Sequence, residues 1–229
     1  MRLNQFIARS GLCSRRAADQ LISSGQIEVN GKIVKDFSYQ VAKSDKVTHQ
    51  NKLLKISVTE LYAFHKPTGY ITSNKDKQNR PTIYDILPEK FKNLKTIGRL
   101  DLNSEGLLLL TNDGELKRKF ELPDNQLKRI YRVRFFGQLT SPHQKLLEQG
   151  LKIGEMQYRP MQIKLIKISS NSWVEVTITE GKNREIRKCF AELGYQVNRL
   201  IRTSYGKYKL DDLKKGEIRA CKVLSHSQN

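Results

Sequence analysis

The chain has 229 residues and a formal net charge of +19, because 42 Lys+Arg stand against 23 Asp+Glu. Its 38% hydrophobic and 28% charged residues exclude a disordered chain and indicate a globular protein with its own core. The excess of positive charge favours a polyanionic partner, either nucleic acid or an anionic membrane surface. No apolar stretch approaches the roughly 18 residues of a membrane-spanning helix, so we expect nucleic acid and no membrane.

The first 57 residues predict two short helices followed by a small sheet. Apolar residues mark one face of a helix over residues 2–9, and Ser14 is a suitable N-cap for a second helix that ends at Gly25. Two alternating runs then flank Asn30-Gly31, a pair typical of a β-hairpin with a type I′ turn.

This segment holds ten Lys+Arg against four Asp+Glu. Its sequences Gly-Leu-Cys-Ser-Arg-Arg-Ala-Ala at 11–18 and Val-Asn-Gly at 29–31 resemble the small RNA-binding domain named after ribosomal protein S4. The start of the second helix also favours a phosphate group through its dipole. We therefore expect five basic residues to contact RNA: Arg2, Arg9, Arg15, Arg16 and Lys32. The alternative is a basic helix pair with a solvated face.

Residues 50–60 are polar and make a plausible linker, so the predicted domains are 1–57 and 61–225. The second domain predicts strands over 61–65, 107–110, 130–135, 161–168 and 173–178, and helices over 83–87, 115–120, 142–149 and 183–193. Regular βαβ alternation and a glycine-rich phosphate loop are both missing from the sequence, which disfavours a Rossmann or P-loop enzyme.

Three local patterns of the second domain bear on its function. Four leucines at 107–110 form a short apolar run bounded by turn residues, which predicts a buried strand. The strand over 130–135 alternates apolar and basic residues, which predicts one buried and one basic face. Ser141 and Pro142 match the N-cap and the first position of a helix.

Three places hold candidate functional residues. They are Asp101 with its neighbour Arg99 on the loop before the leucine run, Tyr131, and the strand-to-helix junction over 180–188. Burial and a nearby cation can tune the protonation of an aspartate beside an apolar wall. A strand-to-helix junction directs backbone N–H groups and cations toward an anion. Each place also has a plainer explanation: a turn aspartate, a half-buried sheet residue and a solvated helix start.

Together these segments resemble the pseudouridine synthases, and more narrowly their RsuA/RluB branch, which joins an S4-type domain to the catalytic domain. Gly-Arg-Leu-Asp at 98–101, with Gly106 and Thr-Asn-Asp-Gly at 111–114, is similar to the signature motif. The segments at 131–133 and 180–187 are similar to the second and third motifs.

Two residues depart from the family pattern: Ser104 stands where Thr is common, and Arg129 where Lys is usual. The resemblance implies an α+β fold. In that fold a small S4-type RNA-binding domain precedes a larger mixed, mostly antiparallel sheet with flanking helices and a central cleft.

The resemblance also implies an isomerase that breaks the N1–C1′ bond of a uridine and forms a C5–C1′ bond, without a metal or organic cofactor. Asp101 is then the essential carboxylate, which either attacks sugar or base or removes a sugar proton, and Arg187 is the cation that pairs with it. Tyr131 would stack on the base and help to remove the C5 proton. Three residues would position the flipped base: Arg99, Lys182 and Arg184. A phosphate contact is the alternative for the first of these.

The expected partner is ribosomal RNA. Segments at 131–137, 146–150 and 200–202 look most like the RluB type, which acts on large-subunit RNA. The small-subunit RsuA type is the second choice, and a non-catalytic ribosome-associated protein is the alternative from another class. Three distant cysteines and four scattered histidines indicate reduced thiols and no metal site, so we expect a cytoplasmic protein. We also expect a monomer.

Overall fold

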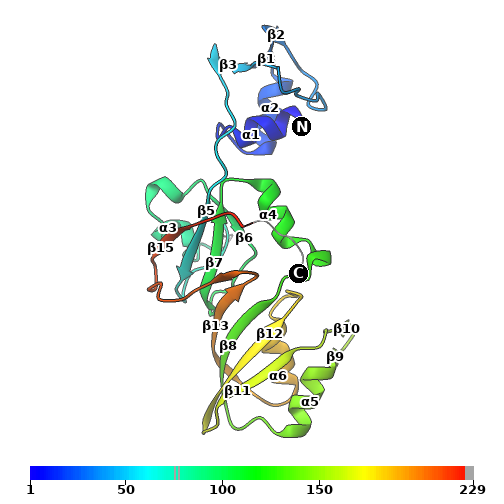
Figure 1. Cartoon of the computed structure of the whole chain (residues 1–229), viewed down its shortest axis with the longest axis vertical. Helices are drawn as coiled ribbons and strands as arrows, with labels where there is room; N and C mark the ends of the chain where they lie inside the picture. Colours follow the sequence, from blue (N-terminus) through cyan, green and yellow to red (C-terminus); the bar gives the residue numbers. More distant parts are fainter. Residues whose placement is uncertain (75, 77, 225–229) are drawn as a thin grey trace. The chain divides into compact units, whose positions relative to one another are not determined.

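The computed structural model describes residues 1–74, 76 and 78–224. Contacts divide the chain into two units, one of Met1–Glu60 with Asn112–Gly114, and one of Leu61–Thr111 with the chain from Glu115 onward. Figure 1 shows the elements of both units in chain order. None of the helices in the described ranges is long and apolar enough to span a membrane.

The first unit packs two helices against a four-stranded sheet of order β2-β1-β3-β4. Its elements are α1 (Leu3–Arg9), α2 (Arg15–Ser23), β1 (Ile27–Val29), β2 (Lys32–Ile33), β3 (Val47–His49) and β4 (Lys52–Leu53). The Ser14 hydroxyl accepts a hydrogen bond from the Ala17 amide at 3.2 Å, which confirms the predicted N-cap. Asn30 and Gly31 both have positive φ, 53° and 76°, as a type I′ turn requires, so the predicted hairpin is confirmed.

The second unit is built on a large sheet of order β11-β12-β8-β13-β7-β5-β15, with β14 beside β13 and β6 beside β7. The strands are β5 (Leu61–Lys66), β6 (Lys95–Ile97), β7 (Glu105–Thr111), β8 (Arg129–Phe136), β11 (Gln162–Lys167), β12 (Asn171–Ile178), β13 (Val197–Tyr205), β14 (Tyr208–Lys209) and β15 (Ile218–Cys221). Strands β9 (Lys152–Ile153) and β10 (Met156–Gln157) form a separate hairpin. The helices are α3 (Ile83–Ile86), α4 (Gly114–Glu121), α5 (Ser141–Gln149) and α6 (Glu185–Glu192), and Glu89–Phe91 and Pro123–Asn125 form single 3-10 turns. The predicted α+β class with a mixed, mostly antiparallel sheet is confirmed.

Strand β7 is buried along its whole length. Leu108 and Leu110 belong to a core cluster that also holds residues of α5 and α6, whereas Leu107 and Leu109 belong to a second cluster with Phe120 of α4. Alternate residues of one strand therefore enter two cores, which explains why its four leucines are consecutive instead of alternating with polar residues.

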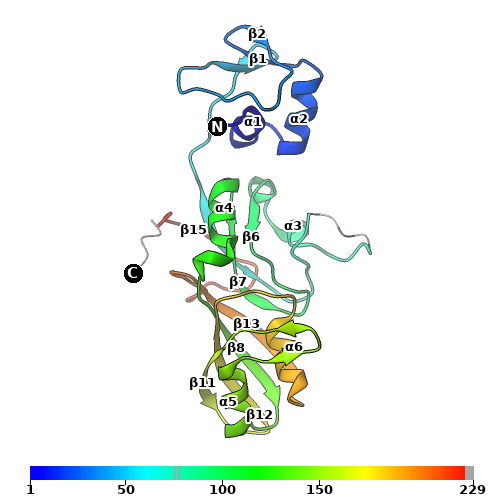
Figure 2. The ribbon, with the colours of Figure 1, turned by 90° about the vertical axis from the view of Figure 1, so that its right-hand side faces the viewer.

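Helices α5 and α6 cover the same face of the sheet at β8 and β12, as Figure 2 shows. Leu147 of α5 and Phe190 of α6 pack with Phe135 and Val174 in one cluster. This arrangement leaves the other face of these strands uncovered by either helix, because successive side chains of a strand point to opposite faces.

Strand β13 joins the two halves of the sheet and was not predicted from the sequence. It pairs antiparallel with β8 and parallel with β7, where Arg202 lies opposite Gly106. A Cβ at Gly106 would lie 2.3 Å from the carbonyl oxygen of Arg202, and its φ of 108° also disfavours other residues. The close approach of β7 and β13 therefore requires glycine at position 106.

Two helix starts differ from the prediction. The N-cap of α5 is Thr140, whose hydroxyl accepts from the His143 amide, so the expected cap Ser141 is wrong by one residue. Helix α6 begins at Glu185 instead of residue 183, because Arg184 stands at its N-cap in the left-handed conformation with φ 51°.

Candidate active site

A pocket of about 950 Å³ opens in the second unit. Its wall is formed by the loop of residues 98–104 before β7, by β8 and β13, and by the junction over residues 181–186 between β12 and α6. Five of the predicted residues line it: Arg99, Asp101, Tyr131, Lys182 and Arg184. The three sequence motifs, which are far apart in the chain, thus line the same pocket.

The backbone of the Asp101 loop is tied to several segments. The Leu100 carbonyl accepts from the Thr72 hydroxyl at 2.9 Å, and the Leu102 carbonyl accepts from the Gly69 amide at 2.9 Å. The Asp101 carbonyl accepts from the Ser104 amide at 3.0 Å. The loop is therefore held through its carbonyl oxygens, and the Asp101 side chain is left to face the pocket.

Lys66 at the end of β5 supplies a buried cation to the same loop. Its ammonium donates to the carbonyl oxygens of Asp101 at 3.1 Å and Ser104 at 2.8 Å, and also to that of Pro67 at 3.0 Å. Burial lowers the pKa of Lys66 to about 8, although the negative charges of Asp101 and Glu105 oppose that shift. The sequence suggested only a turn here, and the signal that could have found this residue is a lysine that ends an apolar strand.

Arg187 of α6 also holds the loop. Its guanidinium donates to the carbonyl oxygens of Asn103 and Val197, both at 2.8 Å. The expected ion pair between Arg187 and Asp101 does not form among the described residues. Burial lowers the pKa of Arg187, whereas the negative charge of Asp101 acts in the opposite direction, so the two groups do interact electrostatically.

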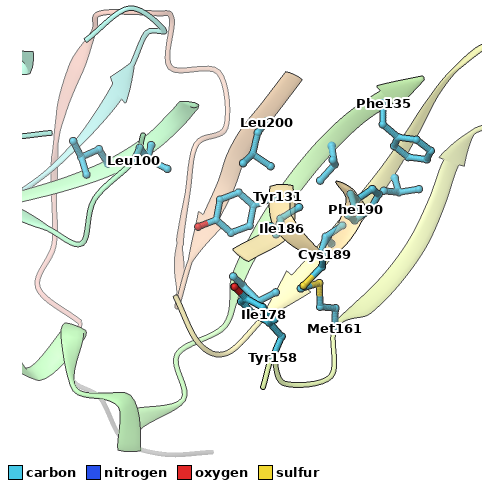
Figure 3. Packing of buried hydrophobic residues seen from close by; sticks show 14 of the residues in the cluster. Leu100, Tyr131, Phe135, Tyr158, Met161, Ile178, Ile186, Cys189, Phe190 and Leu200 are labelled. Atoms are coloured by element: carbon cyan, nitrogen blue, oxygen red, sulfur yellow. The ribbon is translucent and has the colours of Figure 1, made fainter. Parts of the chain in front are cut away.

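Tyr131 of β8 stands where the hydrophobic core meets the pocket. Its side chain is 8% exposed and belongs to the cluster that holds Ile186 and Leu200. In Figure 3 its hydroxyl oxygen points away from Phe135 and Phe190. The ring is thus fixed by packing while its polar end faces the pocket, a geometry suited to stacking on a planar base.

Two arginines on the pocket wall were not expected there. Arg202 of β13 is 1% exposed, and its Nε donates to the Leu107 carbonyl at 2.7 Å, while its Nη2 has no partner among the described residues. Arg129 donates from Nη2 to the Tyr205 hydroxyl at 3.1 Å. Both guanidinium groups also lie over the Tyr205 ring, so they present fixed positive charge to the pocket.

The junction before α6 carries a pair of carboxyl groups. Burial, and then the hydrogen-bonded neighbour Glu180, raise the pKa of Glu185 to about 8. Burial acts in the same sense on Glu180, but the Arg159 amide at 2.7 Å and the Lys182 ammonium at 2.8 Å hold the pKa of Glu180 below its usual value. The pKa values of the two neighbouring carboxyl groups are therefore shifted in opposite directions, while Arg184 beside them is exposed.

The residues predicted to bind RNA in the first unit lie on its surface. Arg2, Arg15, Arg16 and Lys32 are exposed, and Arg9 is half-buried. Across both units, no group of three or more His, Cys, Asp or Glu within the described ranges has the geometry of a metal site.

Comparisons with known proteins identify the family of the chain. The sequence profile of a family described as RNA pseudouridylate synthase matches residues 60–192, and that of the S4 domain matches residues 1–47. A protein of Rickettsia bellii (strain RML369-C), named uncharacterized RNA pseudouridine synthase, is 47% identical over 95% of this chain and 95% of its own. A ribosomal large subunit pseudouridine synthase B of Yersinia pestis is 36% identical over 91% of this chain and 68% of its own. A crystal structure of a pseudouridylate synthase covers 97% of this chain and 96% of that chain, with a TM-score of 0.67 and 30% identity.

The fold and the comparisons define an isomerase of RNA with an added RNA-binding domain. The chain belongs to the RNA pseudouridine synthase family, and its synthase domain follows an S4 domain.

Proposed function

We propose that this enzyme converts a specific uridine of large-subunit ribosomal RNA to pseudouridine, with Asp101 as the essential carboxylate. One observation carries the proposal. The backbone of the Asp101 loop is fixed by hydrogen bonds from Lys66, Thr72 and Arg187, while its carboxylate lines the same pocket as Tyr131. A reactive group held in a rigid frame needs little reorganisation when the substrate arrives.

The pocket residues divide the work between chemistry and binding. A uridine flipped into the pocket would lie with its ribose near Asp101 and its ring against Tyr131, whose hydroxyl assists the loss of the C5 proton. Arg99 is exposed on the pocket wall, where it would fill the gap left in the RNA stack. Lys182 and Arg184 would hold the phosphates on either side of the target nucleotide. Arg187 would act as a positioning residue through the Asn103 carbonyl and through its charge near Asp101.

The test is chemical mapping of pseudouridine in transcripts of both ribosomal RNAs after incubation with the protein. We expect one modified site in the large-subunit transcript, and product formation by Asp101→Asn at least about a thousandfold slower with RNA affinity retained. Modification of the small-subunit transcript instead would assign the RsuA type. Binding of both transcripts without any pseudouridine would support a non-catalytic RNA-binding protein.

We further propose that a single chain is sufficient, because Asp101, Tyr131 and the basic residues of the pocket come from the same unit. Ribosomal RNA as the substrate would place the enzyme in the cytoplasm. Sedimentation of the active protein at assay concentrations tests the first statement, since an obligate dimer would contradict it.

A further inference from the structure

The sheet has a basic face that the pocket does not use. Tyr131 points into the core and the pocket, so its neighbour Arg132 lies on the opposite side of β8. Helices α5 and α6 cover only the Tyr131 side, and Arg132 is exposed. The predicted basic face of β8 is therefore confirmed, and it lies on the side of the strand opposite the active-site pocket.

The register of the strands aligns the side chains of this face in two rows that cross the sheet. The first row runs Lys167, Trp173, Arg134 and Arg199, from β11 through β12 and β8 to β13. The second row runs Lys164, Glu175, Arg132 and Ile201 over the same four strands. Five cations and one carboxylate thus share the eight positions.

An aromatic ring stands within the cations of the first row. The guanidinium carbons of Arg134 and Arg199 each lie 5.9 Å from the centre of the Trp173 ring. Both arginines are held in place, because Arg134 donates to Asn198 Oδ1 at 2.8 Å and Arg199 forms an ion pair with buried Glu105 at 2.5 Å. The exposed cations Lys164, Lys167 and Arg132 surround this fixed group.

We propose that this face binds a single-stranded segment of RNA, with a base stacked on Trp173 or its flanking arginines and phosphates held by Lys164, Lys167 and Arg132. An exposed sheet surface that combines an aromatic ring with fixed guanidinium planes suits unpaired bases. The charge excess suits the phosphodiester backbone. The segment must differ from the target nucleotide, since the two surfaces lie on opposite faces of β8. The binding of single-stranded RNA to this face does not depend on the enzyme assignment. Only the inference that this RNA belongs to the substrate rests on the proposed function.

The single tryptophan of the chain makes the surface directly observable. We would titrate the full-length protein with a 12-nucleotide oligouridylate and follow Trp173 fluorescence at several salt concentrations. We expect quenching on binding. In Arg132→Ala/Lys164→Ala the affinity should fall roughly tenfold, and the slope of log affinity against log salt should fall by about 1.4, for two phosphates of a single strand.

Two variants complete the design. The control Lys145→Ala/Lys152→Ala removes the same charge from exposed positions of α5 and β9, and should bind as the wild type does. Lys167→Glu on edge strand β11 should weaken quenching independently of the first variant. The proposal is overturned by absence of quenching at saturating oligouridylate, by equal affinity of Arg132→Ala/Lys164→Ala and the wild type, or by equal quenching with polyglutamate, which would indicate an acidic protein partner.

Pseudouridine mapping with the same proteins separates this proposal from the proposed function. A protein that quenches with oligouridylate but forms no pseudouridine would contradict the enzyme assignment alone. A protein that forms pseudouridine without quenching would contradict the second surface alone.

Discussion

The two loops that line the pocket are built in opposite ways. The loop over 98–104 has its carbonyl oxygens bound by Lys66, Thr72 and Arg187, and it presents one carboxylate. The junction over 181–184 is held by Glu180 and Glu185, which accept from Lys182. Its cation Arg184 is exposed and has a left-handed backbone conformation. A reactive group gains from a fixed frame, whereas contacts to phosphates tolerate adjustment.

The largest effect is expected where the rigid loop runs into the sheet. Gly106→Ala would place a Cβ 2.3 Å from the Arg202 carbonyl oxygen and so separate β7 from β13. We expect a loss of more than about 4 kcal/mol in the free energy of unfolding, measured by urea denaturation. Gly154→Ala, with φ 57° but nothing within 4 Å, should cost only about 1 kcal/mol. Equal costs for the two variants would show that the close approach of the strands is unimportant.

Removing the buried cation tests whether the rigid loop depends on Lys66. Lys66→Met leaves the carbonyls of Pro67, Asp101 and Ser104 without their shared donor. We expect about 3 kcal/mol lower stability and, in the folded fraction, a lower rate of pseudouridine formation at saturating RNA. Lys209→Met changes an exposed lysine in the same way and should leave both quantities unchanged. Full turnover in folded Lys66→Met would refute the role of this lysine in positioning the loop.

The carboxyl pair predicts a pH dependence for the junction. The pKa of Glu185 is about 8 in the folded protein, above its ordinary value of 4.5, so folding favours the protonated form. The stability it contributes is present below pH 4.5 and is lost as the pH rises toward and through 8. Glu185→Gln keeps a neutral side chain, so its stability advantage over the wild type should be about 4 kcal/mol larger at pH 8.5 than at pH 5.

Urea denaturation at both pH values measures this difference, and Glu192→Gln on the exposed side of the same helix is the control. A constant difference between Glu185→Gln and the wild type across this range would contradict the raised pKa of Glu185.

The smallest effect is expected at the exposed cation of the junction. Arg184→Gly relieves the left-handed conformation at φ 51° and should raise stability by about 1 kcal/mol or less. It also removes the phosphate contact proposed for Arg184, so the salt slope of RNA affinity should fall by about one unit. Arg118→Gly in the exposed part of α4 should lower stability instead, because glycine weakens a helix interior. An unchanged salt slope in Arg184→Gly would remove this residue from the RNA contact.

Helix caps and tight turns were predicted well because interactions between residues that are close in the sequence determine them. The Ser14 cap and the Asn30-Gly31 turn depend on hydrogen bonds and backbone angles within a few residues. The motif containing Asp101 was found for a similar reason, since it stands beside an uninterrupted apolar run. The cap of α5 shifted by one residue to Thr140, because neighbouring hydroxyl residues can serve the same helix end.

The two-part organisation, the buried leucine strand and five of the residues that line the pocket could be predicted from the amino-acid sequence alone. The roles of Lys66, Arg187 and Arg202 emerge only from the folded chain, since each of them has an acceptor far away in the sequence, such as the Leu107 carbonyl 95 residues from Arg202. Cations in a sequence are ordinarily surface residues. Their burial becomes favourable only when folding brings carbonyl oxygens to them, and no local pattern records that encounter.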